Sequence, residues 1–160
     1  MELNPYAKFL GAQDARAAIA MTPGLVHQAV TAMSAEQVAA PISEGKWSPC
    51  QIVSHLADCE IVFSFRLRQT LAMQSPVIQP FDQDDWAKQY AVYDIGSAMA
   101  MFRAAREWNL KLIGGLGAAD WQREMTHPER GTMTFQNVVE TMAGHDLNHL
   151  EQLQKAGTRA

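Results

Sequence analysis

Apolar residues recur every three or four positions along most of the chain, which is the spacing of one buried face of an α-helix. The clearest stretch covers 48–75 and opens on Ser48-Pro49 with Gln51, a helix-start signal in which the glutamine completes a capping box. Similar stretches cover 94–114 and 134–157. Each carries one continuous apolar stripe, so the pattern predicts three long helices.

A further helix is predicted before these, starting at Thr22 as its N-cap with Pro23 at the first helical position. Apolar positions over 25–33 then repeat at helical spacing. The alanine-rich residues 14–21 are expected to add a looser turn or two, and 34–40 a short helix.

The connections between these stretches look irregular. Residues 76–93 contain two prolines and three aspartates, and 126–131 is interpreted as a loop. No segment alternates between apolar and polar residues for long enough to predict a sheet. Four helices with buried stripes predict an all-α fold, a four-helix bundle with irregular connecting loops, in a single domain over 1–160.

Composition places the chain among ordinary globular proteins, with 48% hydrophobic and 19% charged residues. The formal net charge is −4 and no basic run is present, which argues against a nucleic-acid partner. No apolar run approaches the roughly 18 residues of a membrane span, and the first residues do not form a secretory leader. We therefore expect a cytoplasmic protein.

The two cysteines, Cys50 and Cys59, lie on one predicted helix. A separation of nine residues places them roughly 13 Å apart along the helix axis, beyond the reach of a disulfide. We expect both to be small core residues rather than nucleophiles.

Three histidines carry the candidate chemistry. His145 and His149 are four residues apart, so both rings lie on one face of the last helix, and His55 lies on the apolar side of 48–75. If the two helices pack together, three neutral imidazoles converge and leave coordination positions open for catalysis. The alternative is that each is a hydrogen-bonded core histidine without a metal. Spacing alone does not decide between them.

Other residues are weaker candidates. Asp58 is placed to serve as an extra ligand or as an outer carboxylate that orients an imidazole, although a solvated aspartate is an equal alternative. The pair lacks the glutamate of an H-E-x-x-H motif, which disfavours a zinc protease of that type, and Asp146 after His145 points about 100° away around the helix. His127 in the loop and Trp86 in the excursion are weak candidates for lining a substrate pocket.

A series of short motifs follows these landmarks in order. They are Gly45-Lys46-Trp47-Ser48, Ile52-Val53-Ser54-His55-Leu56-Ala57-Asp58, Arg66-Leu67-Arg68, Pro80-Phe81-Asp82 with Trp86, Phe102-Arg103-Ala104-Ala105-Arg106, His127-Pro128-Glu129-Arg130-Gly131-Thr132-Met133-Thr134, and His145-Asp146-Leu147-Asn148-His149-Leu150-Glu151-Gln152. In this order the chain resembles the DinB-like family, also called the DinB/YfiT-like metalloenzymes, over about 22–156. Gly144 beside the first histidine of the pair departs from the family pattern without removing a ligand.

The resemblance implies a four-helix bundle in which His55, His145 and His149 hold a divalent metal ion such as nickel, zinc or iron. It also implies a homodimer. Characterised members of the family include bacillithiol S-transferases and mycothiol-dependent isomerases, so a low-molecular-weight thiol is a possible co-substrate.

Three functions follow as hypotheses. The first is a metal-dependent enzyme, with thiol-dependent S-transfer or isomerisation of small electrophiles preferred and a metal-dependent hydrolase as the alternative. The second is a non-catalytic dimeric bundle, connected with stress, whose metal is structural and closed by four protein ligands. The third is a bundle without metal. An open coordination position facing a solvent-connected pocket would favour an enzyme.

Overall fold

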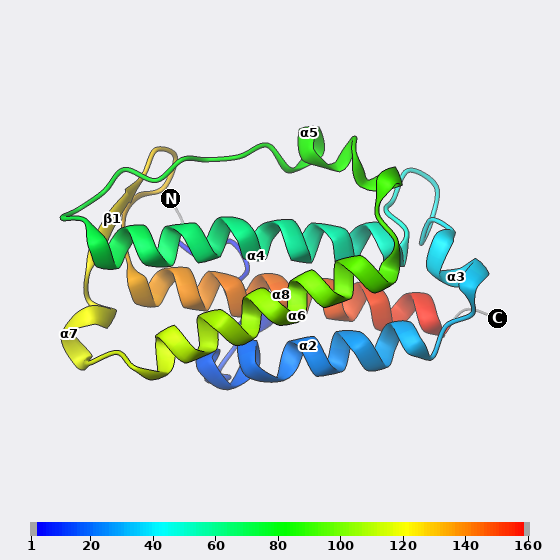
Figure 1. Ribbon diagram of the computed structural model, residues 1–160, viewed down its shortest axis with the longest axis horizontal. Coiled ribbons are helices and arrows are strands. Elements are labelled where there is room, and N and C mark those ends of the chain that lie inside the picture. The colour runs from blue at the N-terminus through cyan, green and yellow to red at the C-terminus, as the bar shows by residue number, and fades with distance from the viewer. Residues whose placement is uncertain (1–2, 159–160) are drawn as a thin grey trace.

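Four long helices form the predicted bundle in the computed structural model, which describes residues 3–158 (Figure 1). The elements of these residues, in chain order, are α1 (Ala7–Leu10), α2 (Ala15–Thr31), α3 (Ala35–Ala39), α4 (Pro49–Ala72), α5 (Gln83–Ala87), the 3-10 turn η1 (Tyr90–Val92), α6 (Ile95–Gly114), α7 (Ala118–Trp121), β1 (Glu124–His127), β2 (Gly131–Thr134) and α8 (Phe135–Gly157).

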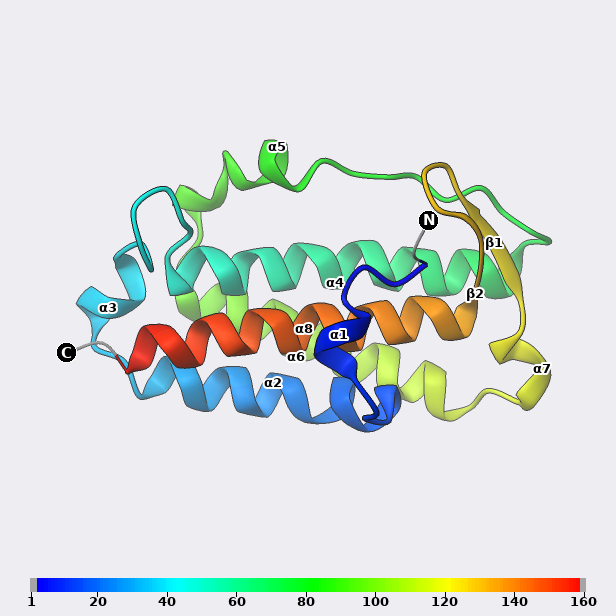
Figure 2. The same cartoon turned by 180° about the vertical axis from the view of Figure 1, so that it is seen from behind.

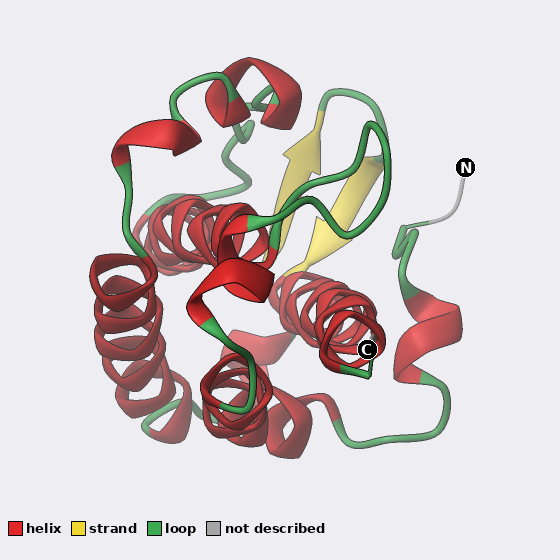
Figure 3. Cartoon of the chain, turned by 90° about the vertical axis from the view of Figure 1, so that its right-hand side faces the viewer, coloured by secondary structure: helices red, strands yellow, loops and turns green. Residues whose placement is uncertain are grey.

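The long helices α2, α8, α4 and α6 enclose the core in that order, as the end-on view in Figure 3 shows. Helices α4 and α6 are neighbours that run in the same direction. Parallel neighbours need a connection that returns along their whole length. The segment 73–94, which carries α5 and η1, is that connection, and it passes along the outside of α4.

The predicted helix starts at 48, 94 and 134 are confirmed in their capping geometry. The backbone N–H of Gln51 donates to Ser48 Oγ at 3.2 Å, and Gln51 Oε1 accepts from the Ser48 N–H at 2.9 Å, which is a complete capping box. Asp94 accepts from the N–H of Ser97 at 2.9 Å, and Thr134 likewise caps α8.

The predicted start at Thr22 is wrong. Helix α2 begins eight residues earlier, at Ala15, because Asp14 supplies an N-cap by accepting from the backbone N–H of Ala17 at 2.8 Å. The alanine-rich stretch is therefore the first part of α2, and Pro23 lies inside the helix.

A proline inside a helix leaves the carbonyl four residues before it without its usual donor. For Pro23 that carbonyl belongs to Ile19, and Arg106 Nη1 donates to it at 2.8 Å. The buried arginine on α6 thus replaces the missing backbone N–H, which explains how the helix continues through the proline.

The expectation of no sheet is also wrong. Residues 124–134 form an antiparallel hairpin in which Met125 pairs with Met133, and both side chains are buried. Gly131, with φ of 79°, begins the second strand. Strands of four residues are too short to show the sustained alternation on which the prediction relied. Val77 in the returning segment forms a parallel bridge with Thr126, which ties this segment to the hairpin.

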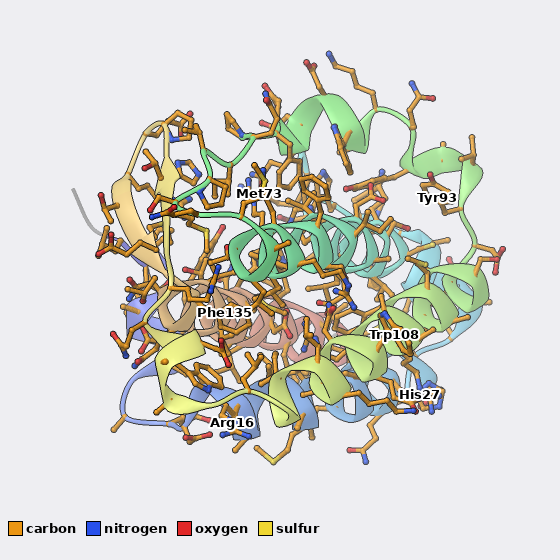
Figure 4. All side chains as sticks on the ribbon, turned by 60° about the vertical axis from the view of Figure 1, so that its left-hand side comes forward. Arg16, His27, Met73, Tyr93, Trp108 and Phe135 are labelled. Atoms are coloured by element: carbon orange, nitrogen blue, oxygen red, sulfur yellow. The ribbon has the colours of Figure 1, made fainter. Side chains whose placement is uncertain are left out.

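The hydrophobic core is divided into two clusters, one toward each end of the bundle. Phe135 lies in the cluster at the hairpin end, whereas Trp108 and His27 lie on the outside of the bundle (Figure 4). The buried charged residues Glu60, Arg106 and Asp146 belong to neither cluster. Within residues 3–158, no helix combines the length and hydrophobicity needed to cross a membrane.

Candidate metal centre

The three candidate histidines meet between α4 and α8. His55 Nε2 lies 2.9 Å from His145 Nε2. The ring centroid of His149 lies 4.9 Å from that of His55 and 4.6 Å from that of His145. All three side chains are at least 93% buried. The packing that spacing alone left open is therefore present.

A fourth side chain joins this group. Cys59 Sγ lies 3.4 Å from His55 Nε2 and 3.8 Å from His145 Nε2. Among the described residues, His55, Cys59 and His145 form a group whose potential ligand atoms all lie within 4.8 Å of one another. Sequence analysis treated Cys59 as a core residue only. Its position one turn after His55 was the available signal, because residues four apart share a helix face.

Burial keeps the imidazoles of His55 and His149 neutral. It lowers the pKa of His55 to about 2, with His145 and His149 as further causes. It lowers the pKa of His149 to about 3, with His145 as the next cause. Neutral imidazole is the form that binds a metal ion. Burial also raises the pKa of Cys59 well above its usual value, so a thiolate there requires a cation beside it.

The arrangement fits a divalent ion. Two imidazole nitrogens bound to one tetrahedral zinc ion are about 3.3 Å apart, given Zn–N distances of about 2.0–2.1 Å. The His55–His145 separation of 2.9 Å is close to that value. The Nδ1 atoms of His145 and His149 are buried without a hydrogen-bond partner among residues 3–158.

A buried ion-pair network lies directly behind His145. Asp146 Oδ1 is 3.8 Å from His145 Nδ1, and Asp146 Oδ2 accepts from Arg106 Nη1 at 2.7 Å. Burial alone raises the pKa of Asp146, but Arg106 brings it to about 2. The resulting negative charge favours a proton on Nδ1 of His145 and leaves Nε2 free to face His55. Sequence analysis missed this role because it considered only the direction of Asp146 around the helix.

Asp58 does not belong to the group of potential ligand atoms. Its carboxylate is hydrogen-bonded to the hydroxyl of Tyr90, and that hydroxyl lies 3.5 Å from His55 Nδ1. Burial raises the pKa of Asp58, and the bond to Tyr90 opposes the rise. The geometry therefore connects Asp58 to His55 through Tyr90, which favours an orienting role over direct ligation.

The N-terminal segment covers the centre from the side of α8 (Figure 2). The ring of Tyr6 lies edge-on to His145 with centroids 5.1 Å apart. A Cβ added to Gly144 would lie 2.5 Å from the backbone oxygen of Tyr6, so only glycine allows this approach. This explains why α8 carries a glycine in its interior.

Two cavities reach the centre from different directions. A cavity of about 150 Å³ is lined by Cys59 and His145, and a cavity of about 510 Å³ is lined by His149 and Trp47. The Trp47 ring also lies 4.8 Å from the ring of His55. Tyr6 lines both cavities. Small molecules can therefore approach the histidines from solvent.

The two weaker candidates differ in position. His127 is buried and lines the smaller cavity together with His145. Trp86 is 39% exposed and packs on Phe81, with ring centroids 5.0 Å apart. Phe81 lines the smaller cavity, whereas Trp86 is not among the residues that line either one.

With this geometry in place, comparison with known proteins defines the family. The sequence profile of the DinB superfamily matches residues 18–153. The chain belongs to the DinB superfamily, as the resemblance predicted, and the matched range contains all three histidines and Cys59.

Several relatives are named as candidate metal-dependent hydrolases. One from Oceanobacillus iheyensis (OB0782) is 27% identical over 82% of this chain and 77% of its own length. YfiT from Bacillus subtilis is 25% identical over 86% of this chain and 79% of its own. One from Geobacillus kaustophilus (GK0616) is 27% identical over 88% and 81%.

The fold also matches a solved structure. That of Bacillus subtilis YfiT, described as a candidate metal-dependent hydrolase with an unusual four-helix bundle topology, superimposes with a TM-score of 0.83. It covers 89% of this chain and 83% of YfiT, at 23% identity. The predicted all-α bundle is thereby confirmed.

Proposed function

We propose that the chain is a metal-dependent hydrolase of small molecules. The observation that carries this proposal is the meeting of three buried imidazoles, two of which, those of His145 and His149, line cavities. A divalent ion bound there would supply Lewis acidity and make water nucleophilic near neutral pH. The names of the relatives support hydrolysis over other metal-dependent reactions.

The protein's own groups prepare the site for this chemistry. Asp146 and Tyr90 orient the rings of His145 and His55 from behind. Tyr6 and Trp47 cover the rings with aromatic surface and restrict the access of bulk water. Imidazole donors suit zinc, nickel and iron, which are the metals that we propose.

The test is turnover by the metal-loaded protein on a panel of small esters, amides and phosphate esters, with and without a low-molecular-weight thiol. The proposal predicts thiol-independent hydrolysis that is lost on chelation, restored by a divalent metal and at least 100-fold lower in His149→Ala. The exposed His27 provides the control variant, His27→Ala, which should retain activity. Turnover only in the presence of thiol would instead support the S-transferase or isomerase that the resemblance implies.

A structural metal is the second candidate, and the position of Cys59 favours it. Three histidines and one thiolate would complete a tetrahedral shell and leave no position for substrate. In cobalt-loaded protein, a cysteine ligand produces a thiolate-to-cobalt charge-transfer band in the near ultraviolet. If the metal is structural, this band should be present in the wild type and in Cys50→Ser. In Cys59→Ser the band should be absent, and much of the metal should be lost.

The hydrolase proposal predicts instead that Cys59→Ser retains its metal. The homodimer implied by the resemblance is a separate prediction, and the mass of the protein in solution tests it.

A further inference from the structure

The smaller cavity has two chemically different ends. At one end it is lined by Cys59 and His145 of the candidate metal centre. At the other end it is lined by Arg66 of α4 and by His127 and Arg130 of the hairpin. Two sequence motifs that the proposed function does not use, around 66–68 and 127–134, therefore meet beside the histidines.

Arg66 is a buried cation whose hydrogen bonds are incomplete. Arg66 is only 9% exposed, and its Nη2 donates to the backbone oxygen of Gln79 at 2.8 Å. Its Nε is buried and has no hydrogen-bond partner among residues 3–158. Burial lowers the pKa of Arg66, and the nearby charge of Arg130 lowers it further. A buried charge of this kind is costly unless an anion accompanies it.

Within residues 3–158, acidic side chains do not fully balance the positive charge at this end of the cavity. Across residues 3–158, no ion pair joins Arg66 or Arg130 to an acidic side chain. Glu129 also lines the cavity, but it is exposed. Its backbone N–H donates to His127 Nδ1 at 3.2 Å, which leaves the other ring nitrogen of His127 as a donor. Two guanidinium groups therefore face one carboxylate, and the end is net positive.

We propose that Arg66 and Arg130 form an anion subsite that binds a carboxylate or phosphate group of the substrate. Guanidinium groups suit both anions, because their N–H groups match the oxygens in pairs. The cavity of about 150 Å³ has room for an anionic group of this size. An anion held there would place the rest of the substrate against His145. This inference rests on the proposed function in one respect, namely that the bound anionic group belongs to the substrate of the hydrolase.

Calorimetric titration of the full chain with inorganic phosphate and, separately, with acetate tests the subsite. The protein is used both metal-loaded and chelator-treated, because anions also bind metal ions directly. In the chelator-treated protein we expect at least one anion to bind, at least tenfold more weakly in Arg66→Gln and Arg130→Gln. Arg103→Gln, an exposed arginine that lines a different cavity, should match the wild type.

Binding of acetate alone would identify a carboxylate substrate, and binding of phosphate alone a phosphorylated one. Equal affinity in all four proteins, or no binding of either anion to the chelator-treated wild type, would overturn the proposal. Arg130→Gln keeps the test decisive if Arg66→Gln does not fold. The absence of metal in the protein would contradict the proposed function but not the subsite, since the titration is made without metal.

Discussion

Two buried polar regions lie side by side at the middle of this bundle, and they differ in how completely their atoms are paired. In the first, Arg106 donates to Glu60, Asp146, Thr22 and the backbone of Ile19. In the second, the three histidine rings face one another, and two Nδ1 atoms have no partner.

The difference separates structure from binding. Each of the four long helices contributes to the Arg106 network, and every nitrogen of the Arg106 guanidinium has a partner within the protein. The histidine cluster contains ring nitrogens that have no partner among residues 3–158. Asp146 belongs to both regions, so the saturated network fixes the position of the unsaturated one.

Removing the centre of the saturated network should have the largest effect. Arg106→Met leaves Glu60 and Asp146 buried without a cation, and we expect the free energy of unfolding to fall by about 3–5 kcal/mol. Urea denaturation measures the loss. Arg103→Met, at an exposed site on the same helix, is the control and should change stability by less than about 0.5 kcal/mol. A loss for Arg106→Met as small as that would show that the network is not structural.

The histidine cluster should make the metal-free protein sensitive to acid. The pKa values of about 2 for His55 and about 3 for His149 lie below the unfolded value of 6.5. Between about pH 3 and 6.5 the unfolded chain therefore binds more protons than the folded one. The contribution of the two neutral histidines to the free energy of unfolding is fully present above this range. It is lost as the pH falls, by up to about 1.4 kcal/mol per pH unit for each histidine.

Urea denaturation of chelator-treated protein at pH 7, 6 and 5 measures this dependence. His149→Gln should reduce the slope, and His27→Gln, at an exposed position, should leave it unchanged. Identical slopes in all three proteins would show that the rings are not held neutral by burial.

Gly144 and Gly24 both lie within helices, but of the two it is Gly144 that packs against the N-terminal segment beside the metal centre. In Gly144→Ala the new Cβ meets the backbone of Tyr6, and we expect a loss of about 1–3 kcal/mol or displacement of the N-terminal segment. Gly24 has no atom within 4 Å of such a Cβ, so Gly24→Ala should raise stability by about 0.5–1 kcal/mol. Thermal unfolding of both variants is the measurement, and equal shifts would contradict the close approach.

The smallest effect is expected from a change at Tyr90, whose hydroxyl lies beside His55. Tyr90→Phe removes the hydroxyl that connects Asp58 to this ring, and we expect metal affinity to fall about tenfold. Tyr93→Phe, at a position 46% exposed, is the control. Competition with a metal indicator dye measures both, and equal affinities would remove Asp58 from the site.

Helical spacing and capping signals were sufficient to predict three of the four long helices and the face on which each histidine lies. They failed at Thr22, because the cost of a proline inside a helix is offset by Arg106, which is distant in sequence. The hairpin was not predicted, because its strands are too short to show a periodic pattern of apolar residues. Cys59 carries a signal on its own helix, four residues after His55. Tyr6 and the Asp146–Arg106 pair could not be assigned to the site, since their roles depend on how helices pack rather than on any one helix.

Metal content per chain tests the central claim most directly. Elemental analysis of purified, metal-reconstituted protein should give close to one divalent ion per wild-type chain and per His27→Ala chain. His55→Ala, His145→Ala and His149→Ala should each retain less than about a tenth of that amount while remaining folded by circular dichroism. Near-zero metal in the wild type, or equal content in all five proteins, would contradict the account.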